Sequence, residues 1–313
     1  MMEPIRVVLD VDTGVDDAMA IALAVAAPTV DLIGVTTVAG NVEIAHTTAN
    51  TLRVLDFVGA TQVPVYRGMT RPLDRPLRTA AWVHGTDGLG GADIAPSTRM
   101  PETTSAPQFL VDVARANPGA LTFVFVGPLT NLAVALALEP ELPRLVQRLV
   151  IMGGAFRVPG NTTPMAEFNI YADPQAAAQV VAAGFAATWI GLDVTMQTLL
   201  NRAQWEALEG ATAPNAALVR MMGARMFAIP GRVGIALHDP LAMAVAIDPS
   251  LVDAPEERVI VDATHGPCEG ATVLLRPNRH DEPIGAGSST HVAQTVDADR
   301  FAALFAETLG LPK

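Results

Sequence analysis

The stretch VVLDVDTGVDDAMAIALAVAAP, residues 7–28, decides the fold and points to a site. An apolar run ends in four aspartates within eight positions, and a helical pattern of small residues follows. This pattern predicts a buried strand over 5–11 and a helix over 16–27. Because carboxylates this close repel one another, a helix N-terminus or a hard cation such as Ca²⁺ must offset their charge. The four are Asp10, Asp12, Asp16 and Asp17.

The same alternation of strand and helix continues along the chain. Further strands are expected at 31–38, 63–68, 121–127, 148–154 and 187–194, and helices at 43–59, 106–119, 129–140 and 173–184. Beyond 195 we expect helices at about 200–228 and 239–247, a β pair at 258–263 and 271–277, and a closing helix at about 289–308. This order is typical of an α/β fold with a doubly wound, mostly parallel sheet and helices on both faces. We expect one domain over residues 1–313.

Composition restricts the class of partner. The formal charge is −12, which disfavours nucleic acid and anionic membranes, since both need clustered basic residues. The single cysteine, Cys268, excludes an intrachain disulfide, and the lone lysine, Lys313, leaves no internal lysine for a Schiff base or a phosphate loop. No leader and no membrane-length apolar run is apparent. We therefore expect a cytoplasmic protein that binds a small molecule.

Several chemistries could use the aspartate cluster. A helix cap explains Asp16 and Asp17 but leaves the two strand aspartates unexplained. An EF-hand loop counted from Asp10 fails, because Gly14 and Ile21 stand at positions five and twelve and a strand precedes it. A phosphatase of the haloacid-dehalogenase type remains an alternative, although Gly14 replaces the threonine of its D-x-D-x-T strand end and its lysine is missing.

The segment DVDTGVDDAMA (10–20) resembles the D-x-D-P-G-x-D-D-A-x-A signature of the inosine–uridine-preferring nucleoside hydrolases, with Thr13 in place of the usual proline. Five further blocks resemble that family in the same order. They are TTVAGN (36–41), VGPLTN (126–131), IMGGAF (151–156), GNTTPMAEFNIYADP (160–174) and HDPLA (238–242). The resemblance covers about residues 7–245 and implies the family's fold and activity.

The resemblance also implies a role for each matching residue. Asp12 is the base that activates water and a Ca²⁺ ligand, and His238 assists the departing nucleobase. Asp17, Asp239 and the Val126 carbonyl complete the metal site. The implied substrate-binding residues are Asp16 and Asn169 for the 2′ and 3′ hydroxyls, Asn161 and Glu167 for the 5′ hydroxyl, and Asn41 and Asp10 elsewhere in the sugar site. In the long loop, His84 could contact the base, and Trp82 could either stack on it or pack in the core.

The expected chemistry is hydrolysis of a ribonucleoside N-glycosidic bond. Such hydrolysis needs an activated water, negative charge facing an oxocarbenium-like sugar, and help for the leaving group. A cation held by carboxylates supports the first of these needs. The resemblance also implies a homodimer or homotetramer. A non-catalytic nucleoside-binding protein on the same fold is the alternative, but such a protein would have no need for a water-activating base. The preferred nucleobase is not apparent from the sequence.

Overall fold

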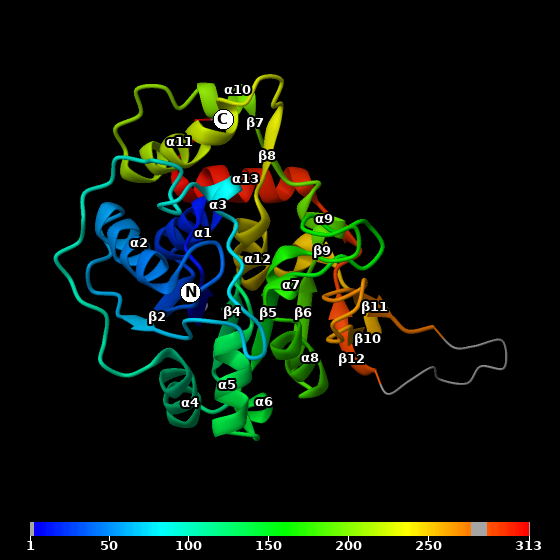
Figure 1. Cartoon of the computed structure of the whole chain (residues 1–313). Helices are drawn as coiled ribbons and strands as arrows, with labels where there is room; N and C mark the ends of the chain where they lie inside the picture. Colours follow the sequence, from blue (N-terminus) through cyan, green and yellow to red (C-terminus); the bar gives the residue numbers. More distant parts are fainter. Residues whose placement is uncertain (1–2, 277–286, 313) are drawn as a thin grey trace.

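The apolar run before the aspartates forms β1 (Ile5–Val11), a strand inside a nine-stranded sheet (Figure 1). The computed structural model describes residues 3–276 and 287–312. The strand order is β11-β10-β12-β6-β5-β4-β1-β2-β3, in which the strands from β12 to β3 run parallel, β10 runs antiparallel to β12, and β11 runs antiparallel to β10. The other strands are β2 (Val30–Thr37), β3 (Val65–Arg67), β4 (Leu121–Phe125), β5 (Arg148–Met152), β6 (Ala187–Ile190), β10 (Glu256–Val261), β11 (Thr272–Leu274) and β12 (Ser288–Val292).

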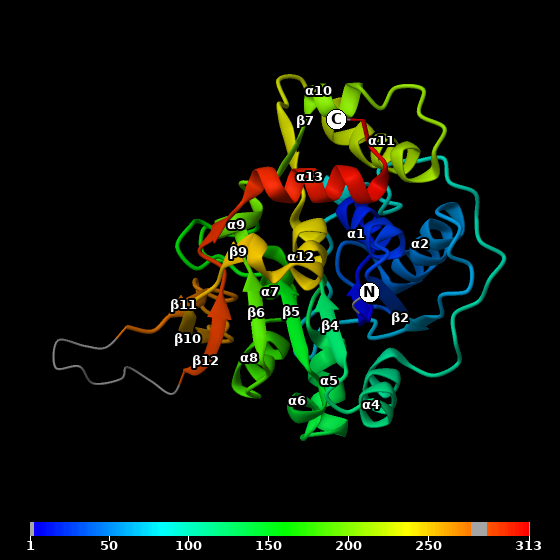
Figure 2. The same cartoon turned by 180° about the vertical axis from the view of Figure 1, so that it is seen from behind.

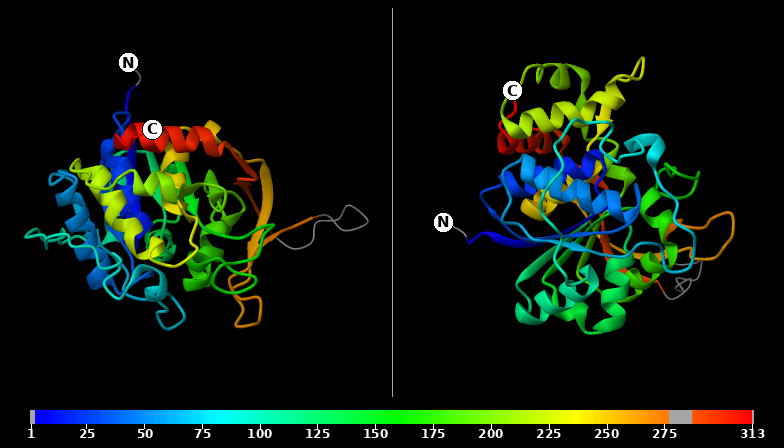
Figure 3. Two further views of the ribbon diagram at one scale, coloured as in Figure 1. Left: turned by 90° about the horizontal axis from the view of Figure 1, so that it is seen from above. Right: turned by 60° about the vertical axis from the view of Figure 1, so that its left-hand side comes forward.

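Both faces of the sheet are buried, which explains why its strands read as continuous apolar runs. Side chains alternate between the faces: Val7 and Leu9 pack in one core, whereas Val8 packs in the other. In β4, Val124 belongs to the first core and Phe123 to the second. Figure 3 (right) shows the resulting helical layers on opposite sides of the sheet. The predicted doubly wound, mostly parallel α/β fold is confirmed.

Helices cover each face, and shorter elements complete the upper end of Figure 1. The first core is covered by α1 (Val15–Ala26), α2 (Ile44–Phe57), α11 (Pro214–Phe227), α12 (His238–Ile247) and α13 (Ala298–Leu309), the last seen along its length in Figure 2. The second is covered by α4 (Ala106–Ala116), α5 (Thr130–Leu138), α6 (Leu142–Leu145) and α8 (Pro174–Ala182). The remaining helices are α3 (Ala81–His84), α7 (Phe168–Ala172), α9 (Leu192–Thr195), α10 (Arg202–Glu206) and the 3₁₀ turn η1 (Pro249–Leu251).

Two expectations after residue 195 are wrong. The closing helix begins only at Ala298, because the segment before it alternates buried and exposed side chains and forms β12 beside β6, followed by β13 (Thr295–Val296), which pairs with β9 (Val252–Asp253). The helical stretch expected from 200 is divided. Its start forms β7 (Leu199–Asn201), which pairs with β8 (Gly234–Ala236), and Gly210, with φ of +73°, separates α10 from α11.

The predicted β pair near the C-terminus is confirmed as β10 and β11, although Pro277, the end of that expected segment, lies outside the described residues. Of the helices that the structure describes, none is long and apolar enough to cross a membrane. The parallel strands all end at one edge of the sheet, and ligands of open α/β sheets bind at that edge. Four of the quoted sequence blocks lie at the ends of β1, β2, β4 and β5, and they begin at residues 10, 36, 126 and 151.

Candidate active site

A cavity of about 560 Å³ lies beyond the strand ends. Most of the residues expected to act on a substrate line it. From the first half of the chain these are Asp16, Asn41, His84 and Val126, and from the second half Asn161, Glu167, Asn169, His238 and Asp239. The chain therefore brings together, in the lining of one cavity, residues that are more than 200 positions apart. Asp10, Asp12 and Asp17 are fully buried and are not part of that wall.

Asp17 organises the turn between β1 and α1. Its Oδ1 accepts a hydrogen bond from the backbone N–H of Asp12 (3.0 Å). Its Oδ2 accepts one from the backbone N–H of Gly14 (2.8 Å) and one from the Asn41 side-chain amide (3.1 Å). A carboxylate in this place caps the helix and meets the positive end of its dipole. The first turn of α1 is thereby fixed, and with it the direction of the neighbouring Asp16.

Asp12 is held on one side only. The backbone N–H of Asn41 donates to its Oδ2 (2.6 Å), whereas Oδ1 is buried and has no hydrogen-bond partner among the described residues. The carboxylate lies against Gly40 and Gly127, and a Cβ at Gly127 would come within 2.9 Å of Oδ1. The two glycines therefore make room for a carboxylate with one free, buried oxygen.

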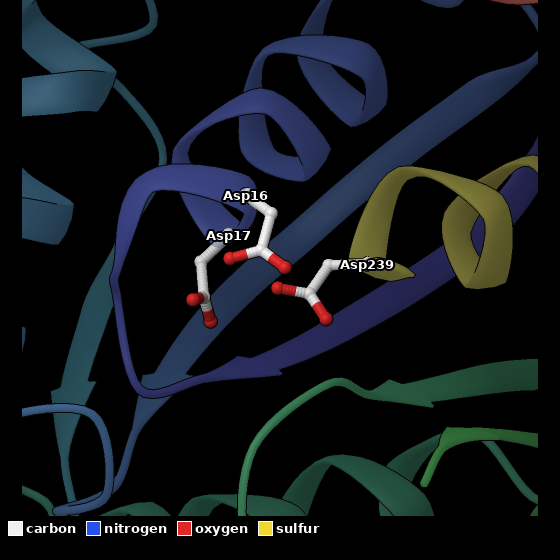
Figure 4. A group of neighbouring side chains, drawn as sticks. All are labelled: Asp16, Asp17 and Asp239. Carbon is white, nitrogen blue, oxygen red and sulfur yellow. The ribbon is translucent and has the colours of Figure 1, made fainter. Parts of the chain in front are cut away.

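Three carboxylates converge at the cavity. Asp16 and Asp17 come from the first turn of α1 and Asp239 from the first turn of α12, and Figure 4 shows their carboxylates facing one another. One oxygen from each lies within 4.8 Å of the other two, which is close enough to hold one metal ion. Asp16 Oδ1, like Asp12 Oδ1, is buried without a hydrogen-bond partner in the described chain.

The buried carboxylates at the cavity need a positive counter-charge in order to be ionised together. Burial, with a smaller effect of the neighbouring Asp16, raises the pKa of Asp17 to about 7. Burial raises the pKa of Asp12 and of Asp239 well above the usual range, and the facing carboxylates raise both further. Ionised carboxylates are unstable together without a counter-charge, so oxygen-rich geometry and charge both fit a hard cation.

Asp10 occupies a different environment. Its Oδ2 accepts hydrogen bonds from the Thr36 hydroxyl (2.5 Å) and the Asn131 amide (2.7 Å), and burial raises its pKa to about 7. Asn131 also donates to the Thr37 carbonyl (3.0 Å). Asp10 thus joins β1 to β2 and α5 rather than lining the sugar site with Asp16.

Two histidines line the cavity, and each has its Nδ1 in contact with a polar group of the protein. His84 Nδ1 accepts the backbone N–H of Val15 (3.1 Å), so its proton is on Nε2 when the ring is neutral. His238 Nδ1 contacts the Thr195 hydroxyl (2.7 Å). Burial lowers the pKa of both imidazoles, although the carboxylate of Asp16 opposes this effect. Each ring therefore keeps Nε2 as the nitrogen available to a ligand.

The opposite wall is built around α7. Glu167 caps this helix, with Oε1 accepting the N–H of Asn169 (2.9 Å) and Oε2 those of Ile170 (3.2 Å) and Gly154 (3.1 Å), and burial raises its pKa to about 7. The Asn169 side-chain amide donates to the Val126 carbonyl (2.8 Å). Asn161 Oδ1 accepts the N–H of Phe168 (2.9 Å). This wall is rigid because backbone groups hold each polar side chain.

Comparison with known proteins identifies the chain. A family model described as inosine-uridine preferring nucleoside hydrolase matches residues 7–303. The chain belongs to this family. It is 38% identical over 312 residues to the pyrimidine-specific ribonucleoside hydrolase RihB of Escherichia coli (strain SE11), covering 98% of this chain and 97% of the relative.

Solved structures agree. The plant nucleoside hydrolase PpNRh1 superposes with a TM-score of 0.92 at 36% identity, over 99% of this chain and 100% of that one. The purine-preferring ribonucleoside hydrolase from Gardnerella vaginalis superposes with a TM-score of 0.87 at 36% identity, over 97% and 98%. The chain is thus a nucleoside hydrolase that acts on the N-glycosidic bond of ribonucleosides. The phosphatase and the non-catalytic alternatives are set aside.

Some residues of this nucleoside hydrolase's site carry no recognisable motif. Thr195, which contacts His238, lies in an unremarkable segment, and its partner is 43 positions away. Met196, Leu199 and Val233 line the cavity from the segments on either side of α10 and α11, outside every quoted motif. Trp82 lines it too and is 65% exposed, so it is not a core residue. The segments 199–201 and 234–236 are three residues each, which is too short to show a strand period in the sequence.

Proposed function

We propose that this nucleoside hydrolase uses Ca²⁺, with Asp12 as the base that activates water and His238 as the group that assists the departing nucleobase. The observation that carries the proposal is the convergence of Asp16, Asp17 and Asp239 within 4.8 Å, beside a cavity that His238 also lines. The substrate is a small ribonucleoside held between the carboxylates and the α7 wall.

The residues present fit a calcium ion. The available donors are carboxylate oxygens and the Val126 carbonyl, the set that Ca²⁺ prefers, and buried oxygens of Asp12 and Asp16 have no hydrogen-bond partner among the described residues. Asp12, Asp17, Asp239 and the Val126 carbonyl would hold the ion. Of the three carboxylates in this set, Asp17 and Asp239 belong to the converging group, whose third member is Asp16, and Asp12 lies outside that group. When bound, the cation supplies charge that stabilises the carboxylates and lowers the pKa of water.

Asp12 would receive the proton through its free oxygen. Asn41 fixes its Oδ2 through a 2.6 Å hydrogen bond, which leaves Oδ1 as the oxygen that takes the proton from the attacking water. Burial raises the pKa of this carboxyl, and a general base works best when its pKa approaches the working pH. The same carboxylates face the sugar, where positive charge develops as the glycosidic bond breaks.

The α7 wall and the histidines complete the assignment. Asn169 and Asp16 would bind the 2′ and 3′ hydroxyls, and Asn161 and Glu167 the 5′ hydroxyl. Thr195 occupies Nδ1 of His238, so Nε2 would donate the proton to the base as it leaves. His84, with its proton on Nε2, would donate a hydrogen bond to the same base.

Two leaving groups separate the two catalytic roles. Every substrate needs the activated water, so Asp12→Asn should abolish hydrolysis of both inosine and p-nitrophenyl riboside. A positioned acid contributes about 10²–10⁴-fold only when the leaving group needs a proton. His238→Ala should therefore slow inosine by about that factor and spare p-nitrophenyl riboside, whose leaving group is stable as an anion.

The measurement is kcat for both substrates in each variant. His46→Ala is the control, because His46 is exposed on α2 and does not line the cavity. An equal loss for both substrates in His238→Ala would show that His238 positions the sugar and that the proton comes from another group. The homodimer or homotetramer and the cytoplasmic location stay predictions, and analytical ultracentrifugation tests the first.

A further inference from the structure

A second cavity lies at the end of α12 that is remote from the active site. Its volume is about 280 Å³, and none of the residues that line it belongs to the cavity of the active site. Its floor is one face of the sheet, where the register places Val150, Thr188 and His291 side by side on β5, β6 and β12. Arg148, the first residue of β5, extends this floor. We call the cavity above these four residues the rear slot.

The roof of the rear slot is apolar. It is formed by Val245 near the end of α12, Pro249 of η1 and Val252 of β9. Helix α12 packs against β5, and Figure 2 shows this side of the molecule. Val150 adds a further apolar side chain from the floor. Hydrocarbon therefore surrounds much of the rear slot, and such a surface favours a ligand with an apolar body.

Arg148 brings an uncompensated positive charge into the rear slot. Its guanidinium is half-buried, and its one hydrogen bond to the described residues runs from Nη2 to the Ala246 carbonyl (2.5 Å). No carboxylate of the described chain forms an ion pair with it, although the sequence has 32 acidic residues against 20 basic ones. Burial lowers the pKa of this guanidinium, as expected for a cation removed from water without a counter-charge. Four of its five N–H groups therefore have no acceptor in the part of the chain that the structure describes.

Thr188 adds a hydroxyl to the same floor. Its side chain makes no hydrogen bond to any residue that the structure describes. It lies on the same face of the sheet as Arg148, because Arg148 is two residues before Val150, the register partner of Thr188. An arginine near a helix C-terminus stabilises the last carbonyls, and Ala246 lies in the last turn of α12. That role accounts for one N–H of Arg148, but not for the Thr188 hydroxyl or the cavity beside it.

We propose that the rear slot binds a small organic carboxylate, with its carboxylate group on Arg148 and Thr188 and its hydrocarbon part between Val150 and Val252. A guanidinium binds a carboxylate through two parallel N–H···O bonds, and the threonine hydroxyl donates to the same group. The ligand is small, because the cavity is near the lower limit of ligand pockets, about 300 Å³. A bare phosphate suits the slot less well, since it leaves the apolar walls without contacts. The site is separate from nucleoside hydrolysis and does not depend on it.

Ligand-observed NMR titration of the full-length protein measures the dissociation constants. The probes are isovalerate and benzoate, with their neutral amides, acetate and inorganic phosphate for comparison. Isovalerate should bind more tightly than acetate, by about fourfold for each additional carbon that is buried. Its amide should bind about tenfold or more weakly, because hydrogen bonds to a charged group are lost. Inorganic phosphate should bind more weakly than either apolar carboxylate.

Variants locate the binding site. Arg148→Gln should weaken isovalerate binding by about tenfold or more, and Thr188→Val, which keeps the shape of the side chain, by a smaller factor. Arg144→Gln is the matched control, because the Arg144 side chain on α6 is 83% exposed and does not line the rear slot. If Arg148→Gln does not fold, Arg148→Lys replaces it: the lysine keeps the charge but loses the paired N–H groups, so binding should still weaken.

Each outcome decides the inference. It is overturned if the folded wild type binds no carboxylate, if acid and amide bind equally, or if phosphate binds more tightly than isovalerate. Binding that Arg148→Gln leaves unchanged, or a loss that Arg144→Gln reproduces, also overturns it, because the carboxylate then binds elsewhere. If the wild type self-associates, binds no carboxylate and is dissociated by Arg148→Gln, the rear slot is an interface between copies of the chain and the inference fails. None of these results depends on nucleoside hydrolysis.

Discussion

Replacing Thr13 by Val removes one hydroxyl from the turn that carries Asp12, and we expect the free energy of unfolding to fall. Thr13 Oγ1 lies 2.6 Å from Thr51 Oγ1, and both residues are fully buried. The Thr51 hydroxyl has one proton and donates it to the Thr47 carbonyl (2.8 Å). Thr13 is therefore the donor in its contact with Thr51, and it ties the turn to α2.

The magnitude follows from the groups left behind. Leaving a buried polar group without its partner costs about 1–3 kcal/mol, and this is the loss expected for Thr13→Val. Thr51→Val leaves the Thr13 hydroxyl without an acceptor and should cost a similar amount. The double variant removes both partners, so its cost should be smaller than the sum by about 1 kcal/mol.

Urea unfolding of the metal-free protein measures all three variants. Thr61→Val, at an exposed loop position, is the matched control. Since the turn also carries the carboxylates, Thr13→Val should weaken Ca²⁺ binding in calorimetry. If Thr13→Val costs no more than Thr61→Val, or if the two losses simply add, the hydrogen bond does not hold the turn and the reasoning is refuted.

Three further outcomes follow from the site. Chelation of the metal should abolish activity and lower the melting temperature, because an ion at 100 times its Kd stabilises the fold by about 2.7 kcal/mol; Asp239→Asn should lose this calcium-dependent shift. Nucleosides without the 2′ hydroxyl should react about tenfold or more slowly, since Asp16 or Asn169 is left unpaired at about 1–3 kcal/mol, and equal kcat/KM for adenosine and 2′-deoxyadenosine would contradict this. Burial raises the pKa of Glu167 from 4.5 to about 7, so the folded state holds a proton that the unfolded state releases, and the metal-free protein should lose stability as pH rises through that window. Because Asp10 and Asp17 titrate in the same window, Glu167→Gln should make this part of the pH profile of the unfolding free energy less steep, and an unchanged slope would show that Glu167 does not contribute.

The sequence predicted the architecture wherever both faces of a strand are buried. Runs such as 121–125 (LTFVF) and 148–152 (RLVIM) each contain one polar residue among four apolar ones, and five residues are too few for a typical helix. It failed for β12, where the exposed Ser289 and His291 alternate with the buried Thr290 and Val292, because four of its five residues are polar and the alternation is not visible as a hydrophobic pattern. It failed for β7 and β8 because a three-residue strand is too short to show a period.

Some residues of the site could be predicted from the sequence, and others could not. Residues in motifs meet because the carboxyl ends of parallel strands share one edge, which the strand order predicts. Partners such as Thr195 for His238 and Thr51 for Thr13 are fixed only by how helices pack against the sheet. No local pattern contains that information. The pairing of β7 with β8 likewise joins segments 33 or more positions apart, with two helices between them in the chain.

The four aspartates of residues 7–28 lie close together because they have different roles. Asp10 joins three elements through Thr36 and Asn131, and Asp17 caps α1 and fixes the turn. Asp10, Asp12 and Asp16 each keep one buried oxygen that accepts no hydrogen bond from the described residues. Burial of such oxygens destabilises the fold, and binding of a cation and a substrate would offset that cost. Asp10 and Asp17 therefore fix the strand and the turn, and Asp12, Asp16 and Asp17 would offer oxygens to the proposed cation and substrate.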